Sequence, residues 1–407
     1  MHIVTSTDIL LPRAEDMGAW SVIACDQFTS EPEYWAAAEA RAAEKPSTLS
    51  LMLPEAWLHT ARADGADGRI AGTMRRYLAE GVFQTVPDSF IYVERTLSDG
   101  RVRRGLVAAL DLEQYDFTGT QRASVRSTEG TVEERLPPRV NIRRGAPLEM
   151  PHTLLLMDDR TDSVLSLAEK AKDTLEKVYD FDLMLGGGHI AGWRVSGETK
   201  AAVQSALDAL DNAALQREKY GDAAENGKLT FAVGDGNHSL AAAKRFWEEK
   251  RETRPENEWE TDPARFALVE IENIHEPSLD FEPIHRVIFD TDTSAFAAEF
   301  TAHRTEWEAE DKTLGERVAA AESFCRAYIA AHGGYIDYIH GDDTARSLGE
   351  KPSCAAVLLP PVEKSGLFLS VLKNGALPKK ELFHGQRTGQ ALLSGMPKDP
   401  LKQLHIT

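Results

Sequence analysis

The sequence predicts an α+β protein in which a mixed sheet is flanked by helices. Strand and helix patterns alternate over the middle of the chain, which is typical of α/β and α+β folds. Of the 407 residues, 42% are hydrophobic, so the chain can bury a full core. Because this length exceeds that of one ordinary domain, we expect two α/β regions, residues 1–250 and 251–407, that pack together and share one site.

The elements of the first 150 residues are predicted from apolar periodicity, capping residues and turn residues. They are, in order, a buried strand at 21–28, a helix of about three turns after the capping box of Ser30 and Glu33, a helix at 69–80 ended by Gly81, and a hairpin of strands 89–97 and 102–112. Gly100 in the turn of this hairpin supplies the positive φ that such turns require.

The later elements surround a charged connection at 248–262 that is broken by proline and poor in apolar residues. They are predicted as a strand at 153–159, a helix at 164–179, two glycine-interrupted strands within 181–195, a helix at 199–218, a strand at 229–236, a helix at 237–250, strands at 266–274 and 284–289, a helix at 314–331, and strands at 335–340, 355–359 and 366–372.

The charge of the chain excludes several classes of partner. A net charge of −19 repels the polyanionic backbone of nucleic acids and the anionic surface of membranes. No segment approaches the roughly 20 apolar residues of a membrane span, and the N-terminus does not match a secretory signal. The three cysteines have no metal-ligand spacing, as expected of thiols in a reducing compartment. We therefore expect a cytoplasmic protein that binds neither nucleic acid nor membrane.

The sharpest local motif is the segment GDGNH at residues 234–238, where a predicted strand runs directly into a helix. Free amides at a helix N-terminus attract anions, and glycines let a ligand approach the backbone. Asp235, Asn237 and His238 add side chains that can orient a metal or transfer a proton. The alternative is that Asp235 or Asn237 only caps the helix.

A second candidate segment, residues 125–144, is rich in arginine within an acidic protein. Arginine matches the geometry of phosphate and carboxylate, and hydroxyl groups beside Gly130 can complete an anion site. The arginines are Arg126, Arg135, Arg139, Arg143 and Arg144, and the interleaved polar side chains are Ser127, Thr128, Glu129 and Thr131. The alternative is a surface loop whose arginines pair with the surplus carboxylates. His285 and Arg286, at the start of a predicted strand, are a weaker candidate pair.

These segments together resemble the DUF1015 family, whose members have no settled function. The resemblance is carried by ACDQFTSEPEYW, RSTEGTVEERLPPRVNIR, YDFDLMLGGGHIAGW, VGDGNHSLAAAK and FEPIHRV, and it extends from Ser21 to about Lys380. More distantly, the strand, DGxH turn and helix are similar to the nucleotide-binding box of the ParB and free serine kinase group. Asp235, Gly236 and His238 match that box, whereas Ser239 stands where the group has an arginine that contacts phosphate.

The distant resemblance implies binding of a nucleotide or phosphorylated metabolite, and a phosphotransferase that uses ATP or ADP and Mg²⁺ on a small hydroxyl metabolite. Such transfer depends mainly on positioning and charge neutralisation. The catalytic candidates are Glu129, Asp235 and His238, with Asp235 also a metal ligand. The candidates for holding phosphate or substrate are Arg126, Thr128, Thr131, Arg139, Gly236, Asn237 and Ser239, with His285 and Arg286 completing the pocket.

Two other functions fit the sequence. The first is a hydrolase or isomerase that holds a divalent metal with histidines drawn from His152, His189, His238 and His285. The second is a non-catalytic module that senses a nucleotide.

Overall fold

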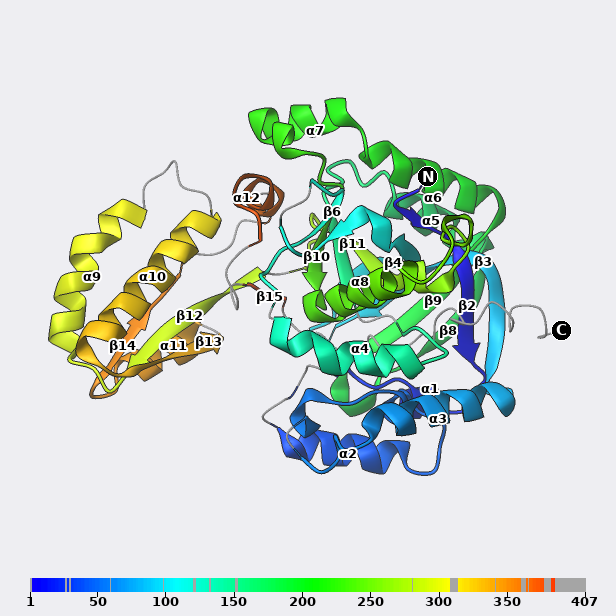
Figure 1. The fold of residues 1–407 in the computed structure, drawn as a ribbon, viewed down its shortest axis with the longest axis horizontal. Coiled ribbons are helices and arrows are strands. Elements are labelled where there is room, and N and C mark those ends of the chain that lie inside the picture. Colours follow the sequence, from blue (N-terminus) through cyan, green and yellow to red (C-terminus); the bar gives the residue numbers. More distant parts are fainter. Residues whose placement is uncertain are drawn as a thin grey trace.

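The computed structural model describes residues 2–25, 28, 31–58, 60–97, 99–119, 122–131, 133–150, 153–279, 281–307, 314–340, 342–359, 364, 366–376 and 382–384. Its elements confirm the predicted class, because a large mixed sheet is flanked by helices (Figure 1). Ser30 of the predicted capping box lies outside the described residues.

The large sheet contains eleven strands within the described residues, and its main path runs β5-β6-β10-β7-β11-β4-β3-β9-β8. Parallel pairs, such as β6 with β10 and β7 with β11, occur beside antiparallel ones. The strands are β1 (Val4–Thr5), β2 (Thr7–Pro12), β3 (Phe83–Thr96), β4 (Val102–Asp111), β5 (Tyr115–Asp116), β6 (Val125–Ser127), β7 (Thr153–Met157), β8 (Glu176–Asp182), β9 (His189–Val195), β10 (Phe231–Asp235) and β11 (Phe266–Asn273).

Helices cover one face of this sheet, and alternation along the strands decides which side chains they meet. Leu106, Leu155 and Val233 point to the face where apolar residues of α4, α5, α6 and α8 pack. The helices of the large domain are α1 (Met17–Trp20), α2 (Pro32–Ala42), α3 (Ala66–Ala79), α4 (Leu136–Gly145), α5 (Leu165–Ala171), α6 (Gly197–Leu210), α7 (Ala213–Tyr220) and α8 (Asn237–Arg251).

The opposite face of the sheet lies towards the N-terminal part of the chain. Ile91, Val107 and Leu268 on this face pack against Ile9 and Leu11 of β2. Helices α1, α2 and α3 gather at one end of the sheet, next to α4 (Figure 1). The boundary between α4 and this N-terminal layer is where the pocket described below opens.

A smaller domain follows β11 and lies to one side of the large sheet (Figure 1). Its strand order is β13-β12-β14, with β15 also paired to β12. Its elements are β12 (Phe281–Phe289), α9 (Thr293–Trp307), α10 (Leu314–His332), β13 (Tyr335–His340), α11 (Asp342–Gly349), β14 (Cys354–Val357), α12 (Gly366–Asn374) and β15 (Leu382–His384). The division predicted after residue 250 stays a prediction; β11, beyond that point, lies within the large sheet.

Three predicted elements are wrong. Residues 21–24 are buried but form no strand, because their side chains pack in an apolar cluster with Trp35. The helix predicted at 164–179 ends early, and residues 176–179 belong to β8. Residues 366–372 form most of helix α12 instead of a strand, since Leu367, Phe368, Val371 and Leu372 lie on one buried helical face. The helix predicted at 199–218 is divided into α6 and α7.

Candidate functional site

The GDGNH segment and the arginine-rich segment meet at the ends of two neighbouring strands. Strands β6 and β10 are parallel, with Val233 aligned to Ser127, so Asp235 at the end of β10 and Glu129 just after β6 lie at the same edge of the sheet. The Thr128 hydroxyl donates a hydrogen bond to the Val233 carbonyl oxygen at 2.6 Å. A crevice beyond the carboxyl ends of adjacent strands is a common place for a ligand in α/β proteins.

The turn between β10 and α8 leaves the helix N-terminus accessible to a ligand. Gly236 has a φ of +78°, and as the N-cap it has no side chain to accept from the helix amides. Asp235 Oδ1 accepts a hydrogen bond from the Gly236 amide at 2.6 Å, so this carboxylate holds the turn. The Ser239 amide already donates to the Gly236 carbonyl oxygen at 3.0 Å, which leaves the Asn237 amide, at the start of the helix, without an acceptor inside the helix. The 15-residue helix α8 therefore directs a positive dipole end towards the carboxyl ends of β6 and β10.

Near the strand ends, some buried polar atoms have no hydrogen-bond partner among the described residues. They include Oδ1 of Asn237, in the first turn of α8, and Oγ1 of Thr131, in the loop after β6. The Asn237 side chain is only 7% exposed. Because a buried polar atom without a partner is costly, these atoms favour a polar ligand or ordered water in the crevice.

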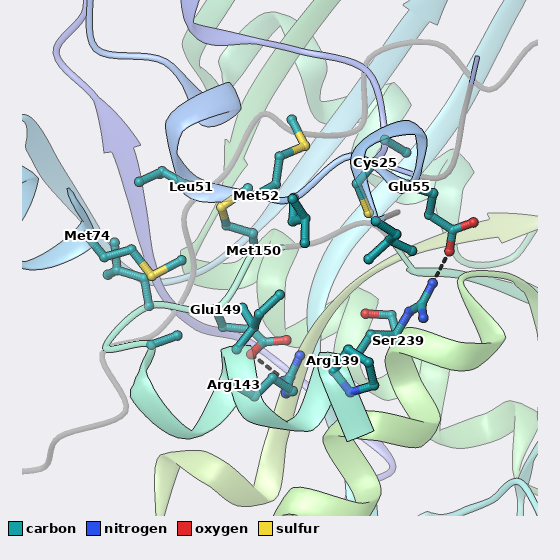
Figure 2. A pocket seen from close by; sticks show the side chains of 17 residues that line it. Cys25, Leu51, Met52, Glu55, Met74, Arg139, Arg143, Glu149, Met150 and Ser239 are labelled. Atoms are coloured by element: carbon teal, nitrogen blue, oxygen red, sulfur yellow. Dashed lines mark hydrogen bonds and ion pairs between the residues drawn. The ribbon is translucent and has the colours of Figure 1, made fainter. Parts of the chain in front are cut away.

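A pocket of about 140 Å³ opens beside this helix end, between α4 and the N-terminal layer (Figure 2). Most of its wall is apolar, and Ser239 of α8 connects it to the helix N-terminus. The apolar lining comes from Ala24, Leu51, Met52, Leu53, Leu58, Met74, Pro138, Ile142, Ala146, Leu148 and Met150, with Cys25 also in the wall.

The charged side chains of the pocket form two ion pairs (Figure 2). Arg139 pairs with Glu55, and its Nη1 also donates to the Arg135 carbonyl oxygen at 2.9 Å. Arg143 pairs with Glu149, but its Nε is buried without a hydrogen-bond acceptor among the described residues. The positive charges of the pocket are therefore balanced within its own wall.

Arg126, predicted to bind phosphate, instead connects backbone segments. Its Nε donates to the Ala123 carbonyl oxygen at 2.9 Å, and its Nη2 donates to the carbonyl oxygens of Asn226 at 2.9 Å and Lys228 at 3.3 Å. Burial lowers the pKa of Arg126 from its ordinary value. With its guanidinium directed at these carbonyl groups, Arg126 positions β6 next to the start of β10.

The structure does not bring His285 and Arg286 to the pocket. Both side chains are fully buried, on β12 of the small domain. His285 Nε2 lies 2.8 Å from Asp342 Oδ1, and its Nδ1 accepts from the Leu359 amide at 3.1 Å. Arg286 Nε donates to Glu322 at 3.2 Å. These contacts give the pair a structural role in the small domain.

The histidines proposed for a metal site are also separated. His189 lies on β9, between Asp182 and Asp180, each at 2.8 Å, and the hydrogen bond with Asp182 raises its pKa. His238 lies on α8, and His152 is outside the described residues. Throughout the described part of the chain, no three His, Cys, Asp or Glu side chains are grouped to hold a metal ion. Nor does this part contain a helix long and apolar enough to cross a bilayer.

Several pocket residues were missed by the sequence analysis. Glu55 and Met74 come from segments distant in sequence, and no local motif marks either one. Arg143 was a named candidate, but its partner Glu149, six residues later and just beyond the arginine-rich segment, was missed although this spacing was a usable signal for an ion pair.

The fold and the site define a mixed α/β protein with an anion-attracting helix end beside an apolar pocket. The chain belongs to the DUF1015 family, described as a protein of unknown function, whose model matches residues 7–353. No curated protein matches the chain.

Two solved structures are similar to the chain at 10% identity. A conserved hypothetical protein from Pyrococcus furiosus aligns over 72% of this chain and 96% of its own, with a TM-score of 0.32. A free serine kinase mutant in complex with AMP aligns over 73% of this chain and 93% of its own, with a TM-score of 0.35. Likenesses this distant carry no argument about function.

Proposed function

We propose that the protein binds a nucleotide or phosphorylated small metabolite, with the phosphate at the N-terminus of α8 and the organic part in the neighbouring pocket. The observation that carries this proposal is the continuity of the two features through Ser239, which belongs to the first turn of α8 and lines the pocket. A helix N-terminus with a glycine cap supplies amide donors to an anion, and the apolar wall suits a ring or chain.

The distribution of charge supports this orientation of the ligand. Arg139 and Arg143 are already paired with Glu55 and Glu149, so the pocket wall offers little net positive charge to a phosphate. The amide of Asn237 then becomes the main phosphate-binding group, and the unpaired Oδ1 of its buried side chain accepts from a hydroxyl group of the ligand. The Thr128 hydroxyl, engaged with the Val233 carbonyl, positions the loop after β6.

The donor set at the strand ends fits Mg²⁺. Asp235 ends β10 and Glu129 follows β6 at the same edge of the sheet, and Mg²⁺ in phosphate sites is usually held by one or two carboxylates together with the phosphates. A bound Mg²⁺ would neutralise phosphate charge. Whichever carboxylate does not hold the ion is the candidate base for a substrate hydroxyl, with half-buried His238 as a further proton-transfer group. Phosphoryl transfer is therefore the reaction class that we propose.

The test is thermal unfolding of the full chain with nucleoside mono-, di- and triphosphates, with and without Mg²⁺. A ligand at 100 times its dissociation constant should stabilise the native state by about 2.7 kcal/mol. We expect a Mg²⁺-dependent shift that is weakened in Asn237→Ala and kept in Arg76→Ala, a control on the exposed surface of α3. No shift with any nucleotide, or an equal shift in Asn237→Ala, would contradict the proposed site.

A further inference from the structure

A second group of charged side chains lies buried on the face of the large sheet opposite α8. Arg95 of β3, Arg103 of β4 and Glu272 of β11 come from three adjacent central strands. Arg95 and Arg103 are each 2% exposed, and Glu272 is 0% exposed. Charges this deeply buried require partners, because water is not there to solvate them.

The partners present do not satisfy these groups. Arg103 Nε lies 2.8 Å from Glu272 Oε1, and Arg95 Nη2 donates to the Gly187 carbonyl oxygen at 2.6 Å. Nε of Arg95, Nη2 of Arg103 and Oε2 of Glu272 have no hydrogen-bond partner among the described residues. The Tyr179 hydroxyl, also buried, has none either. The two guanidinium groups thus keep N–H donors that no described residue accepts, and a ligand or water can accept from them.

Glu270 provides a link from this cluster towards the crevice. It lies two residues before Glu272 on the same face, and it is half-buried although β11 is a central strand. Its carboxylate passes over Gly105, where any larger side chain would overlap it. In the register of the sheet, Glu270 aligns with Leu154, and Leu154 aligns with Asp235. Glu270 and Asp235 are therefore two strands apart on one sheet, with Arg103 and Arg95 one and two strands further on.

We propose that Arg95 and Arg103 bind the carboxylate of a small hydroxy or amino acid, with Glu270 facing its hydroxyl or ammonium group. Paired arginine forks match a carboxylate, and the adjacent glutamates disfavour a dianion such as phosphate. Burial raises the pKa of Glu272 to about 8, so at neutral pH Arg95, Arg103 and the Glu270 carboxylate together leave about one net positive charge, which suits a monoanion. The assignment of this ligand as phosphoryl acceptor rests on the proposed function, whereas its binding does not.

The test is calorimetric titration of the full chain, without nucleotide, using glycolate, glycerate, glycine and alanine, with inorganic phosphate for comparison. We expect at least one carboxylate to bind wild type, Arg103→Lys to weaken it by about tenfold or more, and Arg76→Ala, on the exposed surface of α3, to leave it unchanged. Lysine keeps the positive charge but loses the two parallel N–H donors of the guanidinium group. Circular dichroism and thermal unfolding without ligand will show whether the variant folds.

A crystal structure of wild type with the tightest-binding carboxylate keeps the proposal testable if Arg103→Lys does not fold. Its carboxylate should lie within about 3.2 Å of a guanidinium nitrogen of Arg95 or Arg103. The proposal is overturned if no carboxylate binds, if Arg103→Lys binds as tightly as wild type, or if the carboxylate is found elsewhere. If a carboxylate binds at Arg95 and Arg103 but no nucleotide binds the protein, only the assignment of this ligand as phosphoryl acceptor is wrong.

Discussion

A negative charge introduced at Ser239 should have two opposite effects, one on stability and one on ligand binding. Ser239 is the third residue of α8, where a negative charge stabilises the helix by interacting with its dipole. Ser239 also lines the pocket, where the same charge would repel a phosphate. We expect Ser239→Asp to leave the fold unchanged or stabilise it by about 0.3–1 kcal/mol. Nucleotide binding should fall by about tenfold or more. Urea unfolding and calorimetric titration measure the two effects separately, with Ser239→Ala as control; unchanged affinity in the aspartate variant would place the phosphate elsewhere.

The pKa of Glu272 predicts a pH dependence of stability. Burial raises it from its ordinary value of 4.5 to about 8. Between these values the unfolded chain has lost this proton while the folded chain keeps it, so the free energy of unfolding falls as pH rises. The contribution lost is at most about 1.4 kcal/mol per pH unit.

Glu272→Gln removes this titration, because glutamine stays neutral. We expect the stability of the variant relative to wild type to increase steadily from pH 5 to pH 8. Urea unfolding at intervals across this range measures the difference. A difference that does not change with pH would show that Glu272 is already ionised in the folded protein.

At the residue scale, the sequence predicted the site where the signal was local. Asp235 to Ser239 are adjacent in sequence, and their order of strand, glycine turn and helix was enough to place them together. The partners of Arg126 were not predictable, because the carbonyl groups that it contacts at Asn226 and Lys228 lie about a hundred residues away. The buried contacts of Arg286 likewise depend on the fold of the small domain.

At the scale of elements, the close approach of β8 and β9 depends on a glycine. A side chain at Gly192 of β9 would overlap the ring of Tyr179, which is buried on β8. We expect Gly192→Ala to destabilise the protein by about 1–3 kcal/mol, as overpacking does in a filled core. Thermal and urea unfolding measure this loss.

Gly72 supplies a matched control for that substitution. It lies within helix α3 and is exposed, and a methyl group added there would meet no atom within 4 Å beyond the backbone of its own helix. Gly72→Ala should therefore stabilise the protein by about 0.5–1 kcal/mol, because alanine favours the helix. Equal effects at the two positions would contradict the packing described for Tyr179.

Elements were predicted well where periodicity was decisive and poorly where an apolar run was short. The hairpin of β3 and β4 and the unit of β10 and α8 follow the pattern of their side chains. Residues 366–372 contain too few polar residues to distinguish strand from helix, and only docking on the large domain reveals the buried face of α12. Residues 21–24 are as apolar as a strand, but they pack against side chains and pair with no neighbour in the described sheets.

At the scale of the whole molecule, helix α12 attaches the small domain to the large domain. It lies between β14 and β15 of the small domain in sequence, yet Phe368 is packed with Leu156 and Ala232 of the large sheet. The ring of Phe368 lies parallel to that of Tyr220 of α7, with centroids 6.3 Å apart. The Tyr220 hydroxyl donates to Asp158 at 2.6 Å, and His275 lies 2.7 Å from the same carboxylate, next to the connection that leads to the small domain.

Phe368→Ala should consequently weaken the attachment between the two parts of the molecule. The side chain is 1% exposed, so its loss should reduce the free energy of unfolding by about 3–5 kcal/mol. Leu369→Ala, on the partly buried side of the same helix, should cost clearly less. Combining Phe368→Ala with Tyr220→Leu tests the stacking directly, because contacting residues give non-additive losses. Additive losses, or equal costs for Phe368 and Leu369, would show that α12 does not hold the domains together through this contact.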